Sequence, residues 1–196
     1  PLFILSSLFL LFLYNKKYKI TDEYYEAQND WNHPGSLKKG FLDGLWVTNP
    51  NNQLDILFFG DSHIEQYAPL AKNFSIKFNK NIGFYSKGGC PPLPNVLESK
   101  HPDCIDFFNN FIDILEKNKG IKKVVISGYF NSYFYKPFSE SDKKYDDYGY
   151  NYFQVIDKSK MPLYESFQKH NAFIDFKTKL NKYKNIMFYF ILDNPR

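Results

Sequence analysis

The chain has 196 residues and a mass of 23.3 kDa, enough for one hydrophobic core and a small appendage. Hydrophobic residues make up 43% and charged residues 23%, which excludes a disordered polyampholyte and a wholly membrane-embedded chain. The net charge is +4, but Arg196 is the single arginine among the 25 basic residues. Because phosphates and base edges are usually recognised by the arginine fork, nucleic acid is not expected as a partner.

The first fourteen residues carry no charge and consist mostly of Leu, Ile and Phe. As a helix they would reach about 21 Å, short of a hydrocarbon core of ~30 Å. A soluble helix this apolar would need burial on every side, so residues 1–14 are predicted to be the end of a transmembrane helix. The alternatives are a signal-peptide core and a buried helix. Residues 15–50 are polar and aromatic, with Pro and Gly punctuation, and are predicted to be a juxtamembrane linker.

Short apolar runs and helical patterns alternate downstream of residue 50. The predicted elements, in chain order, are a buried strand over Leu54–Phe59, a helix over His63–Asn73 that Pro69 kinks or ends, one or two strands within Ser75–Tyr85, a helix over Ile105–Asn118, a buried strand over Lys123–Ser127, a polar loop over Pro137–Met161, a helix over Leu163–Tyr183 and a buried strand over Asn185–Leu192. Such alternation with short connections predicts an α/β fold with a parallel sheet. Residues 51–196 are predicted to be one domain, incomplete at its C-terminus because a buried strand normally leads into another element.

The motif Gly60-Asp61-Ser62-His63 lies where the first predicted strand ends and a helix begins. Ligands of open α/β sheets bind outside the carboxyl ends of the strands. Gly60 permits a tight turn and Asp61 can cap the helix. Ser62 would then have its hydroxyl in the cleft and its own N–H pointed at a developing oxyanion. The alternative is a plain helix cap with no chemical role.

The run ILFFGDSH, followed by Gln66–Leu70, resembles the first sequence block of the SGNH (GDSL-type) hydrolases. More narrowly, it resembles the extracytoplasmic SGNH domain fused to bacterial membrane O-acyltransferases of the acyltransferase-3 type. Gly89-Cys90-Pro91-Pro92-Leu93 with Cys104, and Val124–Tyr133 at the third block, are similar to that subgroup as well. The resemblance covers residues 52–196. It implies a three-layer α/β/α sandwich with a mostly parallel sheet, and Ser62 as the nucleophile.

The residues of the oxyanion hole match the family pattern less closely than Ser62 does. SGNH enzymes complete it with a glycine of the second block and an asparagine of the third, which implies Gly89 and Asn131 here. The usual third block is Gly-x-Asn-Asp, whereas this chain has two residues between Gly128 and Asn131 and a serine after it. The alternative for Asn131 is a turn residue after the strand.

A serine hydroxyl needs a base to take its proton, and this family carries Asp-x-x-His near the C-terminus of the domain. Nothing after Ser62 matches that motif: the Asp position before His170 holds Phe167, and Asp193 has no following histidine. Three further positions are dismissed: Asp30 with His33 lies upstream of the nucleophile, His63 is its neighbour and points elsewhere, and His101 is expected at the surface. The catalytic Asp–His pair is therefore expected beyond Arg196, and the fragment itself is expected to be inactive.

Cys90 and Cys104 flank a proline-rich stretch. As a disulfide they would close a loop of about 15 residues, worth about 3 kcal/mol, and would indicate an oxidising compartment. Two free cysteines are the alternative. A metal site is not expected, because His101 is the one further ligand nearby.

The resemblance implies an O-acyltransferase that passes an acyl group, acetyl above all, through an acyl-Ser62 intermediate to a hydroxyl of a cell-surface glycan such as lipopolysaccharide or cell wall. The expected partners are an acyl donor, a glycan acceptor and the membrane, with no cofactor, and the catalytic domain is expected outside the cytoplasm. One alternative is a free-standing GDSL-type carbohydrate esterase with water as acceptor. The other is a non-catalytic glycan-binding domain whose aromatic region Tyr129–Phe153 stacks on sugar rings.

Overall fold

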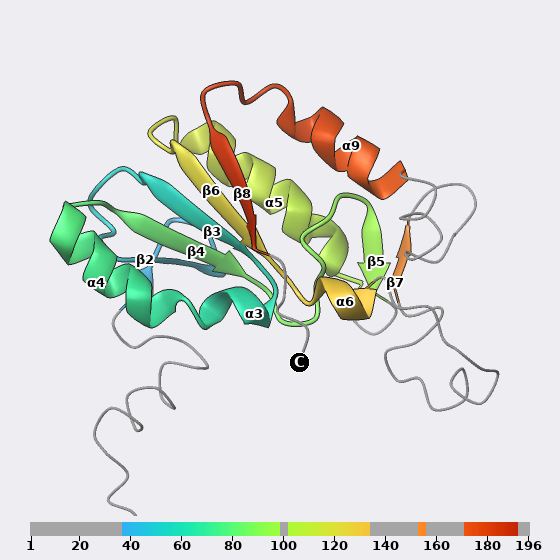
Figure 1. Ribbon diagram of the computed structural model, residues 1–196, viewed down its shortest axis with the longest axis horizontal. Coiled ribbons are helices and arrows are strands. Elements are labelled where there is room, and N and C mark those ends of the chain that lie inside the picture. The colour runs from blue at the N-terminus through green and yellow to red at the C-terminus, as the bar shows by residue number, and fades with distance from the viewer. Residues whose placement is uncertain (1–36, 99–101, 134–152, 156–170, 192–196) are drawn as a thin grey trace, which may run out of the picture.

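The computed structural model describes residues 37–98, 102–133, 153–155 and 171–191 (Figure 1). The strands are β1 (Lys38–Lys39), β2 (Leu45–Val47), β3 (Ile56–Gly60), β4 (Ile82–Ser86), β5 (Val96–Glu98), β6 (Lys123–Ser127), β7 (Phe153–Val155) and β8 (Met187–Ile191). The helices are α3 (Ser62–Glu65), α4 (Ala68–Phe78), α5 (Cys104–Lys117), α6 (Phe130–Tyr133) and α9 (Asn171–Leu180).

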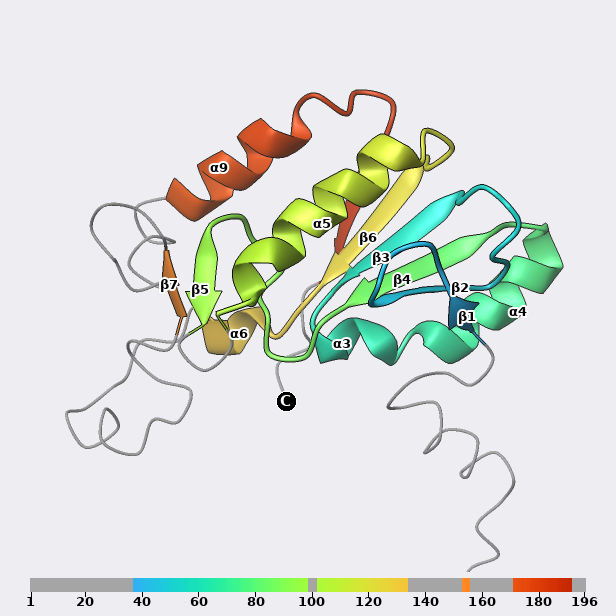
Figure 2. The same cartoon turned by 180° about the vertical axis from the view of Figure 1, so that it is seen from behind.

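Six of the described strands form one mixed sheet in the order β1-β2-β4-β3-β6-β8. The four strands β4, β3, β6 and β8 are parallel, whereas β1 and β2 are antiparallel additions at one edge. Helices α3 and α4 cover one face of the sheet, and α5 and α9 cover the other (Figures 1 and 2). The predicted α/β/α sandwich with a mostly parallel sheet is confirmed.

The larger core lies between the sheet and α5. The apolar residues of α5 recur at helical spacing, so one face of the helix is buried, as the sequence predicts. On that face the Phe111 ring stacks on Phe59 of β3 with their centroids 4.0 Å apart, and Phe107 lies 4.9 Å from Phe59. A smaller core on the opposite face packs two alanines of α4 against β4.

The helix predicted over His63–Asn73 is two helices, α3 and α4. The interruption predicted from Pro69 is confirmed: the break lies at Gln66 and Tyr67, and Pro69 stands in the first turn of α4, where its missing N–H has no intrahelical partner to lose. Helix α4 continues to Phe78, so the one or two strands predicted within Ser75–Tyr85 are one strand, β4, which begins at Ile82. The alternation of Phe74, Ile76 and Phe78 imitates a strand, but these side chains are exposed on the helix surface.

The sheet extends into the segment 15–50 that was predicted to be a linker. Strand β2 pairs with β4, and its Leu45 and Val47 side chains are buried in the larger core. The three residues Leu45–Val47 are too short a pattern to predict a strand from sequence. They form one because their backbone pairs with the neighbouring strand β4.

Strand β8 matches the predicted position but not the predicted burial. Among the described residues it pairs with β6 alone, and each of its side chains is exposed or half-buried. Residues 163–170 of the helix predicted before it, the loop over residues 137–152 and 156–161, and the predicted membrane segment 1–14 lie outside the described residues. None of the described helices is long and apolar enough to cross a bilayer.

The order of the parallel strands creates a switch point beside β3. From β3 the chain passes through α4 to β4 on one side, and from β4 it passes through α5 to β6 on the other side. Because the two helices lie on opposite faces, the connections diverge above the carboxyl ends of β3 and β6. Open α/β sheets bind ligands at this point.

Candidate active site

Strand β3 ends at Gly60, directly against the end of β6. A Cβ atom on Gly60 would lie 1.8 Å from the Ser127 carbonyl oxygen, so no side chain fits between the two strands. The Gly60 carbonyl accepts a hydrogen bond of 3.1 Å from the N–H of Lys87, at the start of the loop after β4. The glycine of the motif therefore allows three chain segments to meet at the switch point.

Asp61 is the N-cap of α3, as the motif predicts. Its backbone is extended, and its Oδ1 accepts a 2.8 Å hydrogen bond from the His63 N–H. Ser62, the first residue of the helix, is exposed at the carboxyl edge of the sheet. The cap holds the turn so that the serine faces solvent and the aspartate faces the protein.

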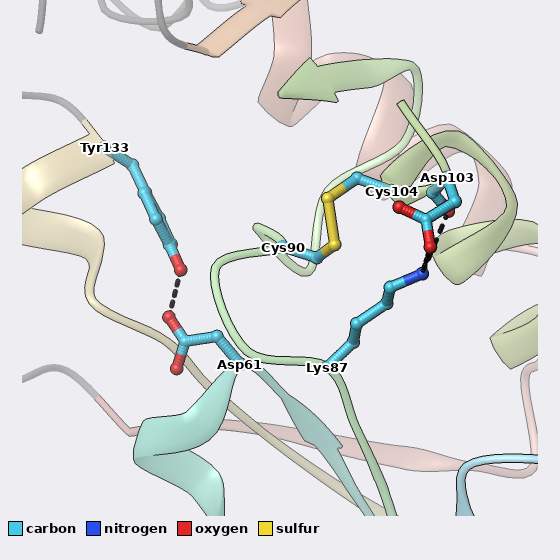
Figure 3. Close-up of a disulfide and its surroundings, with 6 residues drawn as sticks. All are labelled: Asp61, Lys87, Cys90, Asp103, Cys104 and Tyr133. Atoms are coloured by element: carbon cyan, nitrogen blue, oxygen red, sulfur yellow. Dashed lines mark hydrogen bonds and ion pairs between the residues drawn. A yellow bond between two sulfur atoms is a disulfide. The ribbon is translucent and has the colours of Figure 1, made fainter. Parts of the chain in front are cut away.

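The Asp61 carboxylate also joins this turn to the third sequence block. Its side chain is 2% exposed, and Oδ2 accepts a 2.7 Å hydrogen bond from the Tyr129 N–H. The Tyr133 hydroxyl donates to the same oxygen, and Figure 3 shows the two groups facing each other. A buried carboxylate is tolerated when donors satisfy it, so Asp61 links segments about 70 positions apart. The sequence pattern indicated the cap but contained no signal for Tyr133.

The His63 ring is held by Asp61 and Tyr129. Its Nδ1 lies 3.2 Å from Asp61 Oδ1, and its ring stacks on Tyr129 with the centroids 4.8 Å apart and the planes inclined by 25°. Within the described part of the chain, no hydrogen bond reaches the Ser62 hydroxyl, and His63 is the one histidine there. The other three histidines, His33, His101 and His170, lie outside it.

Cys90 and Cys104 form a disulfide, with Cα atoms 5.3 Å apart, so the predicted pairing is confirmed (Figure 3). The bond ties the loop after β4 to the start of α5, and an ion pair between Lys87 and Asp103 spans the same gap. Both cysteines are buried in the larger core. The second sequence block is thereby held against the body of the domain.

The second block also contacts the third. A Cβ atom on Gly128 would lie 3.1 Å from Cδ of Pro92, so the two loops pack closely at the end of β6. Gly89 precedes the disulfide in the left-handed region, at a φ of 75°, and is exposed. Asn131 lies in α6, one short turn after β6. The structure thus brings the three sequence blocks together, while the oxyanion roles of Gly89 and Asn131 stay predictions.

The described residues contain no group of three or more His, Cys, Asp or Glu side chains arranged to hold a metal ion. The polar atoms of the site are instead those of a serine, a buried carboxylate, an imidazole and backbone amides. Such groups suit acyl chemistry, in which a hydroxyl oxygen attacks a carbonyl carbon.

The sequence matches the family described as "SGNH domain (fused to AT3 domains)" over residues 31–195. No curated protein matches the chain. A solved structure, the periplasmic domain of a lipopolysaccharide acetyltransferase from Salmonella ser. Paratyphi A, is similar at 16% identity and a TM-score of 0.45. The match covers 74% of this chain and 46% of that one.

Proposed function

Because the chain belongs to the family of SGNH domains fused to AT3 domains, we propose that it transfers an acyl group through an ester formed on Ser62. The observation that carries this proposal is the exposed position of Ser62 on a capped turn at the switch point of the sheet. A hydroxyl placed there is open to substrate, while the buried Asp61 holds its backbone still.

The reaction has two balanced halves. In the first, Ser62 Oγ attacks the carbonyl carbon of an acyl donor, its proton passes to a base, and the leaving group of the donor departs with a proton. In the second, an acceptor hydroxyl attacks the acyl-Ser62 ester, loses its proton to the base, and Ser62 Oγ regains a proton. Gly89 and Asn131 are the proposed donors to the oxyanion of each tetrahedral intermediate.

The base is assigned to no described residue. The ring of His63 is held by Asp61 and Tyr129, and no hydrogen bond connects it with Ser62 in the described part of the chain. The Asp-x-x-His pair expected from the family resemblance therefore remains a prediction.

The acyl group is proposed to be acetyl and the acceptor a hydroxyl of a cell-surface glycan. The disulfide supports a location outside the cytoplasm, because such bonds persist in oxidising compartments. Attachment to the membrane is proposed through residues 1–14, which lie outside the described residues.

The proposal is tested in the full-length protein with p-nitrophenyl acetate as donor. Release of p-nitrophenol is expected to fall by orders of magnitude in Ser62→Ala, and mass spectrometry is expected to find acetyl on the peptide that contains Ser62. The matched control is Ser75→Ala, since Ser75 lies on α4 and its hydroxyl donates to Thr48 Oγ1.

Four outcomes separate the candidate functions and test the nucleophile. Acetyl-Ser62 that passes to added glycosides supports the transferase, and acetyl-Ser62 that passes to water alone identifies an esterase. Wild-type release in Ser62→Ala overturns the nucleophile, and glycan binding without any Ser62-dependent release identifies a non-catalytic binding domain.

A further inference from the structure

Two aromatic rings beside Ser62 remain exposed to solvent. His63 follows the proposed nucleophile in the chain, and Tyr129 lies just after β6, so the rings come from the first and third sequence blocks. Tyr129 is 47% exposed and the His63 side chain 39% exposed. Their centroids are 4.8 Å apart, within the range of stacked rings. The stacked rings of His63 and Tyr129 therefore offer a substrate an exposed apolar surface near the Ser62 hydroxyl.

The pair is held in place by one buried carboxylate. Asp61 Oδ2 accepts from the Tyr129 N–H at 2.7 Å, and Asp61 Oδ1 accepts from the His63 N–H at 2.8 Å and lies 3.2 Å from His63 Nδ1. The rings therefore do not depend on a ligand to bring them together. A surface that is ordered before binding loses little conformational entropy when a ligand arrives.

The same carboxylate sets the tautomer of His63. An ionised carboxylate can only accept hydrogen bonds, so the hydrogen between the two groups belongs to Nδ1 of the imidazole. In the neutral ring, Nε2 is then a hydrogen-bond acceptor. No hydrogen bond to Nε2 is present among the described residues. The exposed pair thus offers an aromatic surface with an acceptor at its edge.

This combination suits a pyranose ring. A sugar of this kind presents C–H groups on its faces, which pack against aromatic rings, and hydroxyl groups around its edge, which donate to acceptors. Binding sites of this type join apolar contact with a few placed polar groups. A flat aryl ester such as p-nitrophenyl acetate would use the stacked rings but has no hydroxyl to give to Nε2.

We propose that His63 and Tyr129 form the acceptor subsite, where a pyranose ring lies against the stacked pair and donates a hydroxyl hydrogen bond to His63 Nε2. The inference rests on the proposed function, because it places the acceptor beside acyl-Ser62. Asp61 is a positioning residue of this subsite and contacts no substrate.

The test uses the full-length protein, p-nitrophenyl acetate as donor and a panel of methyl hexopyranosides as acceptors. Tyr129→Ala is expected to raise the acceptor KM about tenfold, while release of p-nitrophenol without acceptor changes less than about twofold. Tyr129→Phe keeps the ring and is expected to keep the acceptor KM within about twofold. His63→Phe keeps an aromatic ring but lacks Nε2, so it is expected to raise the acceptor KM and spare donor cleavage.

The matched control is Tyr189→Ala on β8, because Tyr189 is about as exposed as Tyr129 but belongs to a strand outside the three sequence blocks. Thermal melts of each variant show whether it folds. If Tyr129→Ala lowers donor cleavage and transfer equally, the ring is merely structural and the inference fails.

Two further results distinguish a failure of this inference from a failure of the proposed function. Loss of Ser62 dependence overturns the proposed function itself. Ser62-dependent release with an unchanged acceptor KM in both ring variants, or with no transfer to any glycoside of the panel, overturns the subsite alone.

Discussion

Strands β6 and β8 are neighbours of equal length with opposite surroundings. Both contain five residues, both are parallel, and their residues pair in register. Val124 and Ile126 of β6 are fully buried, whereas their partners on the more apolar β8, Phe188 and Phe190, are half-buried and 43% exposed. The difference arises because β6 lies between β3 and β8, while β8 has one described neighbour. Burial of a strand is decided by what lies beside it, not by its composition.

The largest effect is expected where β3 and β6 meet. Gly60→Ala places a Cβ atom 1.8 Å from the Ser127 carbonyl, which forces the strands apart and is expected to cost about 4 kcal/mol or more. Urea denaturation of the two proteins measures this loss. In the matched control, Gly88→Ala, the new Cβ meets no atom within 4 Å and a change of about 0.5 kcal/mol at most is expected. Equal urea midpoints for Gly60→Ala and wild type would contradict this, because they would show that β3 and β6 can move apart with little loss of stability.

A pair of phenylalanine truncations compares the inner sheet with its edge. Phe59→Ala on β3 empties a site enclosed by the rings of α5 and is expected to cost about 3–5 kcal/mol. Phe190→Ala on β8 removes a half-exposed ring whose described ring contact is Phe176, so a cost of about 1 kcal/mol is expected. Chemical denaturation gives both values. Similar costs would mean that β8 is covered in solution.

The disulfide covalently joins the loop after β4 to the start of α5. Replacing Cys90 and Cys104 together by alanine is expected to cost about 3 kcal/mol, since the unfolded chain regains the freedom of a loop of about 15 residues. A melt of oxidised and reduced wild-type protein provides an independent comparison. The result would contradict the prediction if the double variant melted with the oxidised protein.

The smallest effect is expected in an exposed cluster that joins α5 to the turn between α9 and β8. Glu116 accepts from Lys119, Lys182 and Tyr183, and these hydrogen bonds, that of Lys119 first, lower the pKa of its carboxyl to about 2. In the unfolded chain the Glu116 carboxyl keeps its ordinary, higher pKa. As the pH falls, it therefore binds a proton before the Glu116 carboxyl of the folded protein does. The stabilisation is therefore complete at neutral pH and is lost as pH falls from about 5 towards 2.

In Glu116→Gln this part of the pH dependence is expected to disappear. Urea midpoints at neutral and acidic pH should lie closer together in the variant than in wild type. Asp113→Asn is the matched control, because Asp113 lies on the same helix, 3.9 Å from Lys117. A wild-type pH dependence in Glu116→Gln would place the titrating group elsewhere.

Local patterns predicted the elements whose information lies within a few residues. The helical spacing of the phenylalanines specified α5, the apolar run of Lys123–Ser127 specified β6 to the residue, and the Asp-Ser pair after β3 specified the capped turn. The family resemblance, confirmed over residues 31–195, rested on the same short blocks.

What the sequence determined by itself was therefore the four parallel strands, the long helix α5, the turn that presents Ser62 and the pair of cysteines. The tertiary structure alone decided that β2 joins the sheet, that β8 is exposed and that Asp61 anchors both Tyr129 and Tyr133. The physical reason is separation along the chain: a cap or a helical stripe forms between residues a few positions apart. The partners of Asp61 stand 68 and 72 positions away, and only the packed sheet brings them within hydrogen-bonding distance.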